Sequence, residues 1–110
     1  MSSMAPEVES LEYVLEGTQP VGSFAPVLVG VVGSGNLEVL LEPRAGTGCR
    51  FEVETSARGF GEIWAAVVRD FHERHPLAGL QVSIHDMGAT PAVVSLRLAQ
   101  AVAALPGGAA

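Results

Sequence analysis

The stretch Gly33-Ser34-Gly35-Asn36 holds the serine whose setting best suits chemistry. Glycine and asparagine tolerate a positive φ, and all four residue types favour turns. One interpretation is a plain hairpin turn between two predicted strands, at 27–32 and 37–42. The other is that the turn presents the Ser34 hydroxyl to solvent, where small neighbours leave room for a partner or a large group. A phosphate-binding loop is disfavoured, because a strand follows instead of a helix N-terminus.

A second candidate is the pair His85-Asp86 at the end of a predicted strand. Adjacent strand residues point to opposite faces of a sheet, so these two side chains do not form a hydrogen-bonded dyad. Ser34 could pair with His85 in a small hydrolase, but no acid that would orient His85 is evident on its own face. We interpret Asp86 as the start of the turn into the next helix and His85 as a surface residue.

The remaining reactive residue types offer little chemistry. His72 and His75 have the i, i+3 spacing of two ligands to one metal, but they lack a third ligand nearby. We therefore expect a solvated helix end and no metal site. Cys49 is the only cysteine, which precludes an internal disulfide and fits a reducing compartment. It lacks an activating base, so the residues themselves predict no catalytic arrangement.

Composition narrows the classes of function. The chain has 110 residues, enough for one domain, and its hydrophobic fraction of 48% argues against disorder. Twelve acidic residues outweigh six basic ones, all arginine, and no basic cluster exists to bind nucleic acid. No apolar run reaches the roughly 18 residues of a membrane span, and the N-terminus has no secretory signal. We expect a cytoplasmic protein that binds neither nucleic acid nor membrane.

Hydrophobic periodicity predicts the element order β-β-β-β-α-β-α. The strands are expected at 11–17, 27–32, 37–42, 50–56 and 80–85. The apolar run at 27–32 is expected to be buried on both faces, and the first strands to pair as hairpins. The strand at 50–56, the first helix and the strand at 80–85 form a right-handed crossover. The result is an α+β two-layer sandwich, in which two helices cover one face of a mixed, mostly antiparallel sheet of about five strands.

The helices have clear apolar stripes. The first carries Phe60, Ile63, Trp64, Val67, Val68 and Phe71 on its inner face, and Glu62, Arg69, Asp70 and Glu73 outside. Pro76 ends it, and Trp64 is expected in the core. Thr90 is the expected N-cap of the second helix, with Pro91 at the first helical position. Flexible tails are predicted at 1–10 and 106–110, on either side of one domain at 11–105.

Two separated motifs carry a family resemblance. The stretches GVVGSGNLEVLLEP (30–43) and IHDMGATPAVVSLRLAQA (84–101) resemble the delta subunit of malonate decarboxylase, the acyl carrier protein of that enzyme. The likeness runs from about residue 11 to residue 105. A citrate lyase acyl carrier subunit is a more distant relative and an alternative reading.

The resemblance implies a non-catalytic carrier. Ser34 would bear a covalent 2′-(5″-phosphoribosyl)-3′-dephospho-coenzyme A arm through a phosphodiester bond, and the arm would carry acetyl or malonyl as a thioester. A prosthetic-group transferase would attach the arm, and a malonyl transferase would supply malonyl. The partners would be the acyl-transferase (alpha) subunit and the decarboxylase (beta and gamma) subunits, which release carbon dioxide and regenerate the acetyl thioester.

The same resemblance assigns roles around Ser34. Gly33, Gly35 and Asn36 would shape the attachment loop, and His85 and Asp86 would lie near the arm or a partner surface. The family pattern usually has aspartate where this chain has Asn36, which keeps the turn propensity and removes a charge. Two classes compete with the carrier: a stand-alone Ser/His hydrolase and an α+β domain that binds a small ligand reversibly.

Overall fold

Alternating apolar and polar side chains build the main sheet of the computed structural model, which describes residues 8–30 and 37–106. The five strands of this sheet are β1 (Glu9–Glu16), β3 (Val27–Val29), β4 (Leu37–Pro43), β5 (Gly48–Thr55) and β7 (Leu80–Asp86). Two short strands, β2 (Gln19–Pro20) and β6 (Leu77–Ala78), pair in parallel beside it. The helices are α1 (Gly61–Arg74) and α2 (Pro91–Ala103). Residues 1–7 and 107–110 lie outside the described residues, so the predicted tails stay predictions.

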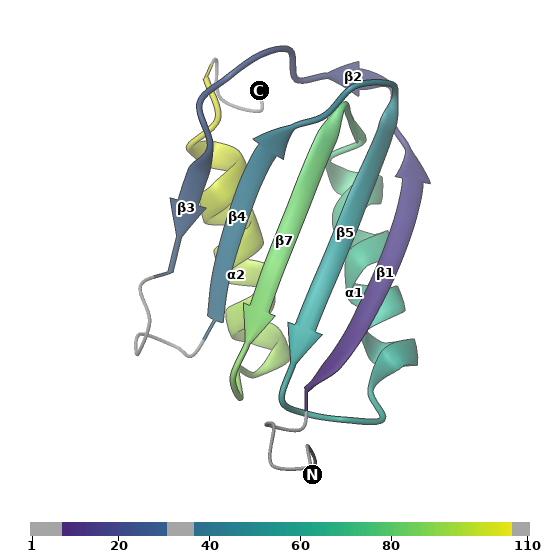
Figure 1. Cartoon of the computed structure of the whole chain (residues 1–110), viewed down its shortest axis with the longest axis vertical. Coiled ribbons are helices and arrows are strands. Elements are labelled where there is room, and N and C mark those ends of the chain that lie inside the picture. The colour runs from purple at the N-terminus through teal and green to yellow at the C-terminus, as the bar shows by residue number, and fades with distance from the viewer. Residues whose placement is uncertain (1–7, 31–36, 107–110) are drawn as a thin grey trace, which may run out of the picture.

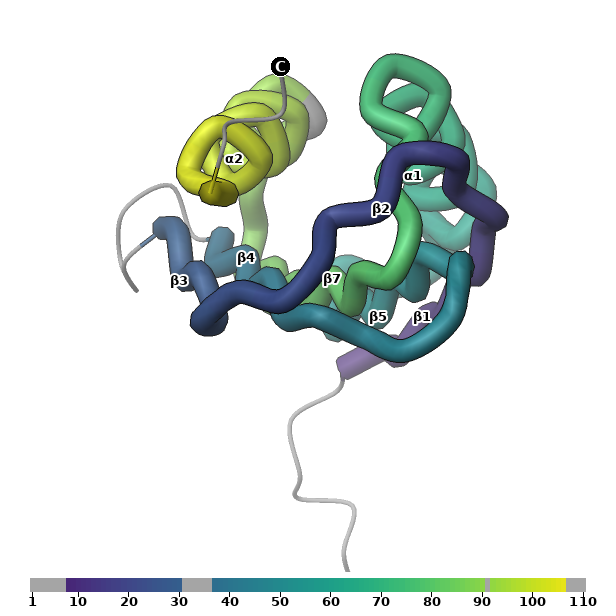
Figure 2. Tube along the Cα trace, turned by 90° about the horizontal axis from the view of Figure 1, so that it is seen from above, coloured from purple at the N-terminus to yellow at the C-terminus, as the bar shows by residue number. Residues whose placement is uncertain are grey.

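The strand order in the sheet is β1-β5-β7-β4-β3 (Figure 1). Strands β5 and β7 are parallel and joined through α1, whereas the other three pairings are antiparallel. Both helices cover the same face of the sheet, as the view along the strands makes clear (Figure 2). The predicted α+β sandwich with a mixed five-stranded sheet is confirmed.

The pairing of β1 differs from the prediction. We expected hairpins among the first strands, but β1 pairs antiparallel with β5, with Leu11 opposite Val53. The crossover places β7 on one side of β5 and leaves its other edge available for β1. There the Tyr13 hydroxyl donates to the Gly61 carbonyl at 2.8 Å, which ties β1 to the start of α1. Of the early strands, β3 and β4 do pair with each other.

The expected burial of the apolar run at 27–32 is also wrong for its described part. The strand β3 covers only three residues and pairs only with β4, and Leu28 is 61% exposed. The reason is the position of β3 at the edge of the sheet, where it has one strand neighbour and helix cover on one face only. Apolar composition alone does not distinguish such an edge strand from a central one.

The core lies between the sheet and the helices. It is built from the inward side chains of β4, β5 and β7 and the facing stripes of α1 and α2. Phe51 and Phe71 pack edge to face with ring centroids 5.9 Å apart. Trp64 is buried in this core, as predicted. The opposite face of the sheet is polar, and there Arg50 forms ion pairs with Glu12 and Glu52.

Candidate functional site

The edge hairpin brings both ends of the segment 31–36 together. Strand β4 begins at Leu37, and β3 leads into Gly30. Gly30 has a φ of 88°, and a Cβ atom placed on it would lie 2.2 Å from the Leu37 carbonyl oxygen. Only glycine allows this approach at such a φ. The close contact means that the six residues between them start and finish at one place on the sheet.

The predicted attachment residues, Gly33, Ser34, Gly35 and Asn36, lie outside the described residues. Their predicted roles therefore stay predictions.

Arg97 lies at the same place, against the ends of this segment. It projects from α2, and its Nε and Cδ atoms would be 3.1 and 3.2 Å from a Cβ on Gly30. Its Nη1 donates to the Gln100 side chain at 3.0 Å. Sequence analysis did not single out this residue. The sequence nevertheless contained a feature that marks this residue, because Arg97 is the only charged residue within α2.

Asp86 is the last residue of the adjacent strand, β7, and its side chain lies on the inner face of the sheet, which the helices cover. It lies opposite Leu37 in the register of β4 and β7, and it is only 4% exposed. Thr55 donates its hydroxyl to Oδ2 at 2.8 Å. The backbone amides of Gly88 and Ala89 donate to Oδ1 at 3.0 and 2.8 Å. Asp86 thus starts the turn into α2, as we interpreted it.

The turn leads directly into the capped start of α2. The Thr90 hydroxyl accepts from the Val93 amide at 3.3 Å, and Pro91 is the first helical residue. Both predicted roles are confirmed. The cap satisfies an amide that would otherwise lack a partner at the helix start. Together with Asp86, it holds α2 in place relative to the sheet.

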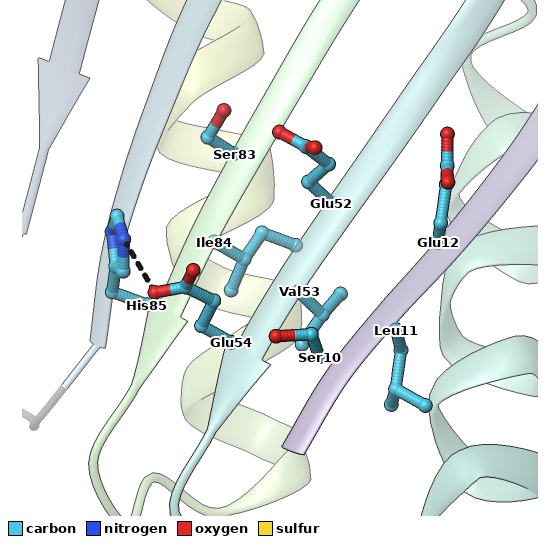
Figure 3. Close-up of a pocket in the computed structure, with 9 residues that line it drawn as sticks. All are labelled: Ser10, Leu11, Glu12, Glu52, Val53, Glu54, Ser83, Ile84 and His85. Atoms are coloured by element: carbon cyan, nitrogen blue, oxygen red, sulfur yellow. Dashed lines mark ion pairs between the residues drawn. The ribbon is translucent and has the colours of Figure 1, made fainter. Parts of the chain in front are cut away.

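His85 points to the face of the sheet that neither helix covers, which we call the open face. Its neighbour Asp86 points to the opposite face, as predicted. The Nε2 of His85 lies 3.3 Å from a Glu54 carboxylate oxygen (Figure 3). Its Nδ1 lies 3.8 Å from a carboxylate oxygen of Glu38. The three residues come from three adjacent strands, β5, β7 and β4. The close-up also shows Ser83 on β7 and Ser10 on β1 along the same face (Figure 3).

The expectation that no acid accompanies His85 on its face is therefore wrong. Glu38 and Glu54 are far from His85 in the sequence, and only strand pairing places them beside it. Glu54 and His85 border a shallow hollow of about 270 Å³ on the open face. Among the hydrogen bonds of the described residues, none joins His85 to a serine hydroxyl. The described part of the chain thus contains His–carboxylate pairs and no nucleophile bonded to them.

An apolar groove of about 300 Å³ opens between the two helices. It is lined by Ala57, Phe60, Ile63, Trp64, Val67, Asp86, Gly88, Ala89 and Val94. Phe60 and Ile63, which we expected on the inner stripe of α1, are 45% and 50% exposed at its rim. The stripe prediction fails at these positions because the separation between α1 and α2 leaves them uncovered.

Two histidines and the cysteine also differ from simple surface groups. His72 is buried instead of solvated, because the chain turns back after α1 and brings the Leu77 carbonyl within 3.1 Å of its Nε2. His75 packs against the Phe71 ring.

Cys49 is buried in β5, and this burial raises the pKa of its thiol to about 12. Within residues 8–30 and 37–106, no three His, Cys, Asp or Glu side chains gather as metal ligands do.

Comparison with known proteins identifies the family. The model of the malonate decarboxylase delta subunit family matches residues 25–105. The chain belongs to this family. It is 72% identical over 96 residues to the malonate decarboxylase acyl carrier protein of Burkholderia cepacia, covering 87% of this chain and 89% of that one. It is 53% identical over 106 residues to the protein of the same name from Stenotrophomonas maltophilia R551-3, covering 92% and 97%.

A solved structure supports the same assignment. A chain from the crystal structure of a Pseudomonas malonate decarboxylase hetero-tetramer in complex with malonate superimposes with a TM-score of 0.75. The two chains are 40% identical, and the match covers 84% of this chain and 94% of the other. The sandwich described above is therefore a fold found within malonate decarboxylase. No helix among the described residues is long and apolar enough to cross a membrane.

The predicted site residues occupy two faces in this delta-subunit fold. Asp86 is an inner-face structural residue, whereas His85 belongs to the open face. Both lie at the sheet end that meets the segment containing Ser34, because Leu37 and Glu38 are their partners across the sheet. Arg97 reaches the same end from the helix layer.

Proposed function

We propose that this protein is the non-catalytic acyl carrier subunit of a malonate decarboxylase, with Ser34 as the attachment residue. The observation that carries the proposal is the family match over residues 25–105, which includes both sequence motifs. The specific prosthetic group, 2′-(5″-phosphoribosyl)-3′-dephospho-coenzyme A, is part of the proposal. It would supply a thiol that carries acetyl or malonyl as a thioester.

The residues around the attachment segment fit such a group. An arm linked through a phosphodiester places one negative charge close to the serine, and a guanidinium is a strong partner for phosphate oxygens. Arg97 provides a guanidinium against Gly30, at the point where the segment starts and finishes. The Gly30–Leu37 contact leaves no room for a side chain there, so the segment is held close at its base.

The protein's own part in the reaction would be tethering. The β4–β7 pairing and the buried Asp86 network make a rigid end of the sheet beside the attachment segment. A short flexible tether can raise the local concentration of a bound group to about the millimolar range. A carrier of this kind needs no nucleophile or oxyanion site, since its partners would provide them.

The proposed partners follow from the family. They are the acyl-transferase (alpha) and decarboxylase (beta and gamma) subunits, together with the prosthetic-group transferase and the malonyl transferase. The similar Pseudomonas chain comes from a hetero-tetramer, which supports assembly with other subunits. A cytoplasmic location is part of the same proposal, and the buried free thiol of Cys49 is compatible with it.

Intact-mass analysis tests the proposal. The protein is co-expressed with its loading enzymes, and the wild type should gain the mass of the arm. Ser34→Ala should remain unmodified, whereas the matched variant Ser83→Ala, on the open face of β7, should still be loaded. An unmodified wild type, or an adduct that persists in Ser34→Ala, would refute the proposal. The mass also reports whether acetyl or malonyl is bound.

A hydrolase is the second candidate, and the His85–Glu54 pair at 3.3 Å is the observation that favours it. An imidazole oriented by a carboxylate is the arrangement that activates a serine nucleophile. If the protein is a hydrolase, the purified chain without partners should turn over an activated ester, and His85→Ala should abolish this activity. We expect no turnover above that of His85→Ala.

A further inference from the structure

Exposed apolar side chains gather around the groove between the two helices. Phe60 and Ile63 form part of its rim, and Met87 immediately precedes Gly88, which also lines it. These three large side chains are 45%, 50% and 54% exposed. The connections that carry Phe60 and Met87 lie at the same end of the sheet (Figure 1). A contiguous exposed apolar patch of this kind marks a surface that binds another molecule.

The wall of the groove offers no free charge. Asp86 is the only ionisable residue among those that line it. Its Oδ2 accepts from the Thr55 hydroxyl, and its Oδ1 accepts from the backbone amides of Gly88 and Ala89. An ionic ligand would lose its water in this groove without gaining a charged side-chain partner. The groove therefore suits an apolar group.

The groove is also preformed. Its floor is made by Trp64 and Val94, which are buried and belong to the hydrophobic core. The hydrogen bonds of Asp86 hold the turn that leads into α2. Binding would restrict mainly the rim side chains Phe60 and Ile63, so little ordering opposes it.

Charge distinguishes between the molecules that could fill the groove. The chain has a net charge of −6, so two copies repel each other, and so does an anionic lipid surface. A different protein can carry the opposite charge around an apolar centre, which makes the two surfaces complementary. The volume of about 300 Å³ accommodates a few apolar side chains of such a partner.

We propose that this groove is the docking site for apolar side chains that project from another subunit of the decarboxylase. The inference rests on the proposed function, because a carrier has to bind the subunits that act on its acyl group. A stable interface buries roughly 800 Å² on each partner, so the groove would form its apolar centre and the surrounding acidic surface would meet basic groups.

The position of the groove fits this role. Asp86 lines the groove and also lies opposite Leu37 in the register of β7 and β4. A subunit docked here would therefore sit beside the sheet end at which β4 begins. The Asp86 hydrogen bonds would keep that end and the docking site in a fixed relation.

A binding titration with matched variants tests the proposal. The alpha, beta and gamma subunits are purified together without this chain, and the chain is titrated into them. Ile63→Asp places a charge at the half-exposed rim and should weaken binding about tenfold or more. Leu96→Asp, at a 53% exposed position of α2 that does not line the groove, should bind as tightly as wild type. Urea unfolding of both variants shows that each is folded.

A second measurement observes the wild-type sequence. Trp64 is the only tryptophan of the chain, so 5-fluorotryptophan labelling gives one fluorine resonance from the groove floor. Addition of the unlabelled subunits should shift this resonance. Tyr13 is the only tyrosine and lies on β1, outside the lining of the groove. The resonance of 3-fluorotyrosine at this position should stay in place.

The outcomes separate this inference from the proposed function. A wild-type chain that neither gains the arm by intact mass nor binds the subunits would refute both. If wild type is loaded and bound, but Ile63→Asp binds equally well and the Trp64 resonance does not move, the docking site is wrong and the carrier function stands. Sedimentation of the isolated chain as a dimer that Ile63→Asp dissociates would show that a second copy fills the groove, which also overturns the inference.

Discussion

Leu37, the first residue of β4, lies directly opposite Asp86, the last residue of β7. This pairing joins the two sequence motifs of the chain, because one contains the predicted attachment serine and the other the turn into α2. It also places the start of β4 beside a buried carboxylate whose two oxygens both accept hydrogen bonds. The sheet end is therefore held by both backbone pairing and side-chain hydrogen bonds.

Loss of the Asp86 carboxylate should destabilise the fold. Asp86→Ala leaves the Thr55 hydroxyl and the amides of Gly88 and Ala89 without their acceptor, so the free energy of unfolding should fall by about 2–4 kcal/mol. Asp70→Ala, which removes an exposed carboxylate from α1, should cost less than ~1 kcal/mol. Urea denaturation measures both. Equal losses in the two variants would contradict the structural role of Asp86.

Gly30 and Gly46 form a matched pair for the contact at the base of the segment. Both have positive φ, at 88° and 93°, but nothing lies within 4 Å of a Cβ on Gly46. Gly46→Ala should therefore cost only the backbone strain, about 1–2 kcal/mol. Gly30→Ala adds a clash with the Leu37 carbonyl and should cost about 1–3 kcal/mol more. Thermal and urea unfolding would show the difference, and a Gly30 variant as stable as the Gly46 variant would exclude the clash.

The burial of Cys49 makes the stability of the fold depend on pH in the alkaline range. The pKa of its thiol is raised to about 12 in the folded protein, whereas the pKa of a thiol in an unfolded chain is about 8.5. Above the pKa of the unfolded thiol, the unfolded chain releases a proton that the folded chain keeps. The free energy of unfolding therefore declines as pH rises towards 12. The stability of wild type relative to Cys49→Ala should fall by up to about 1.4 kcal/mol per pH unit between pH 9 and 10. A constant difference between the two proteins over that range would be the contrary result.

The two residues Ile63 and Val68 test the boundary of the core on α1. Val68 is 1% exposed and Ile63 is 50% exposed at the groove rim. Val68→Ala should lower the free energy of unfolding by about 2 kcal/mol, and Ile63→Ala by less than ~1 kcal/mol, although it removes the larger side chain. Urea unfolding of both variants provides the comparison. The reverse order would mean that the groove is closed in solution.

Local sequence signals predicted the parts of this protein that depend on local physics. Strand alternation correctly assigned His85 and Asp86 to opposite faces, because the period of two follows from the backbone itself. Thr90 and Pro91 marked the start of α2, since capping involves only neighbouring residues. The crossover through α1 was predictable because a strand, a helix and a second strand in succession form a standard unit in which the two strands pair in parallel. The spacing of apolar residues also placed Trp64 in the core.

Contacts between distant segments could not be predicted in this way. The pairing of β1 with β5, the edge position of β3, the burial of His72 and the carboxylates beside His85 all depend on which strands and turns meet. Arg97 is the clearest case, because α2 and β3 are far apart in the sequence and meet only after the sheet is assembled.

The sequence by itself thus determined the element types, the caps and the serine between two glycines that the family resemblance marks for attachment. The tertiary structure alone decided what lies at the sheet end where β4 begins: Asp86 on the inner face opposite Leu37, His85 with its glutamates on the open face and Arg97 against Gly30. The physical reason is that propensity and periodicity act over a few residues. Strand register and helix packing, in contrast, are set by burial of apolar surface across the whole chain.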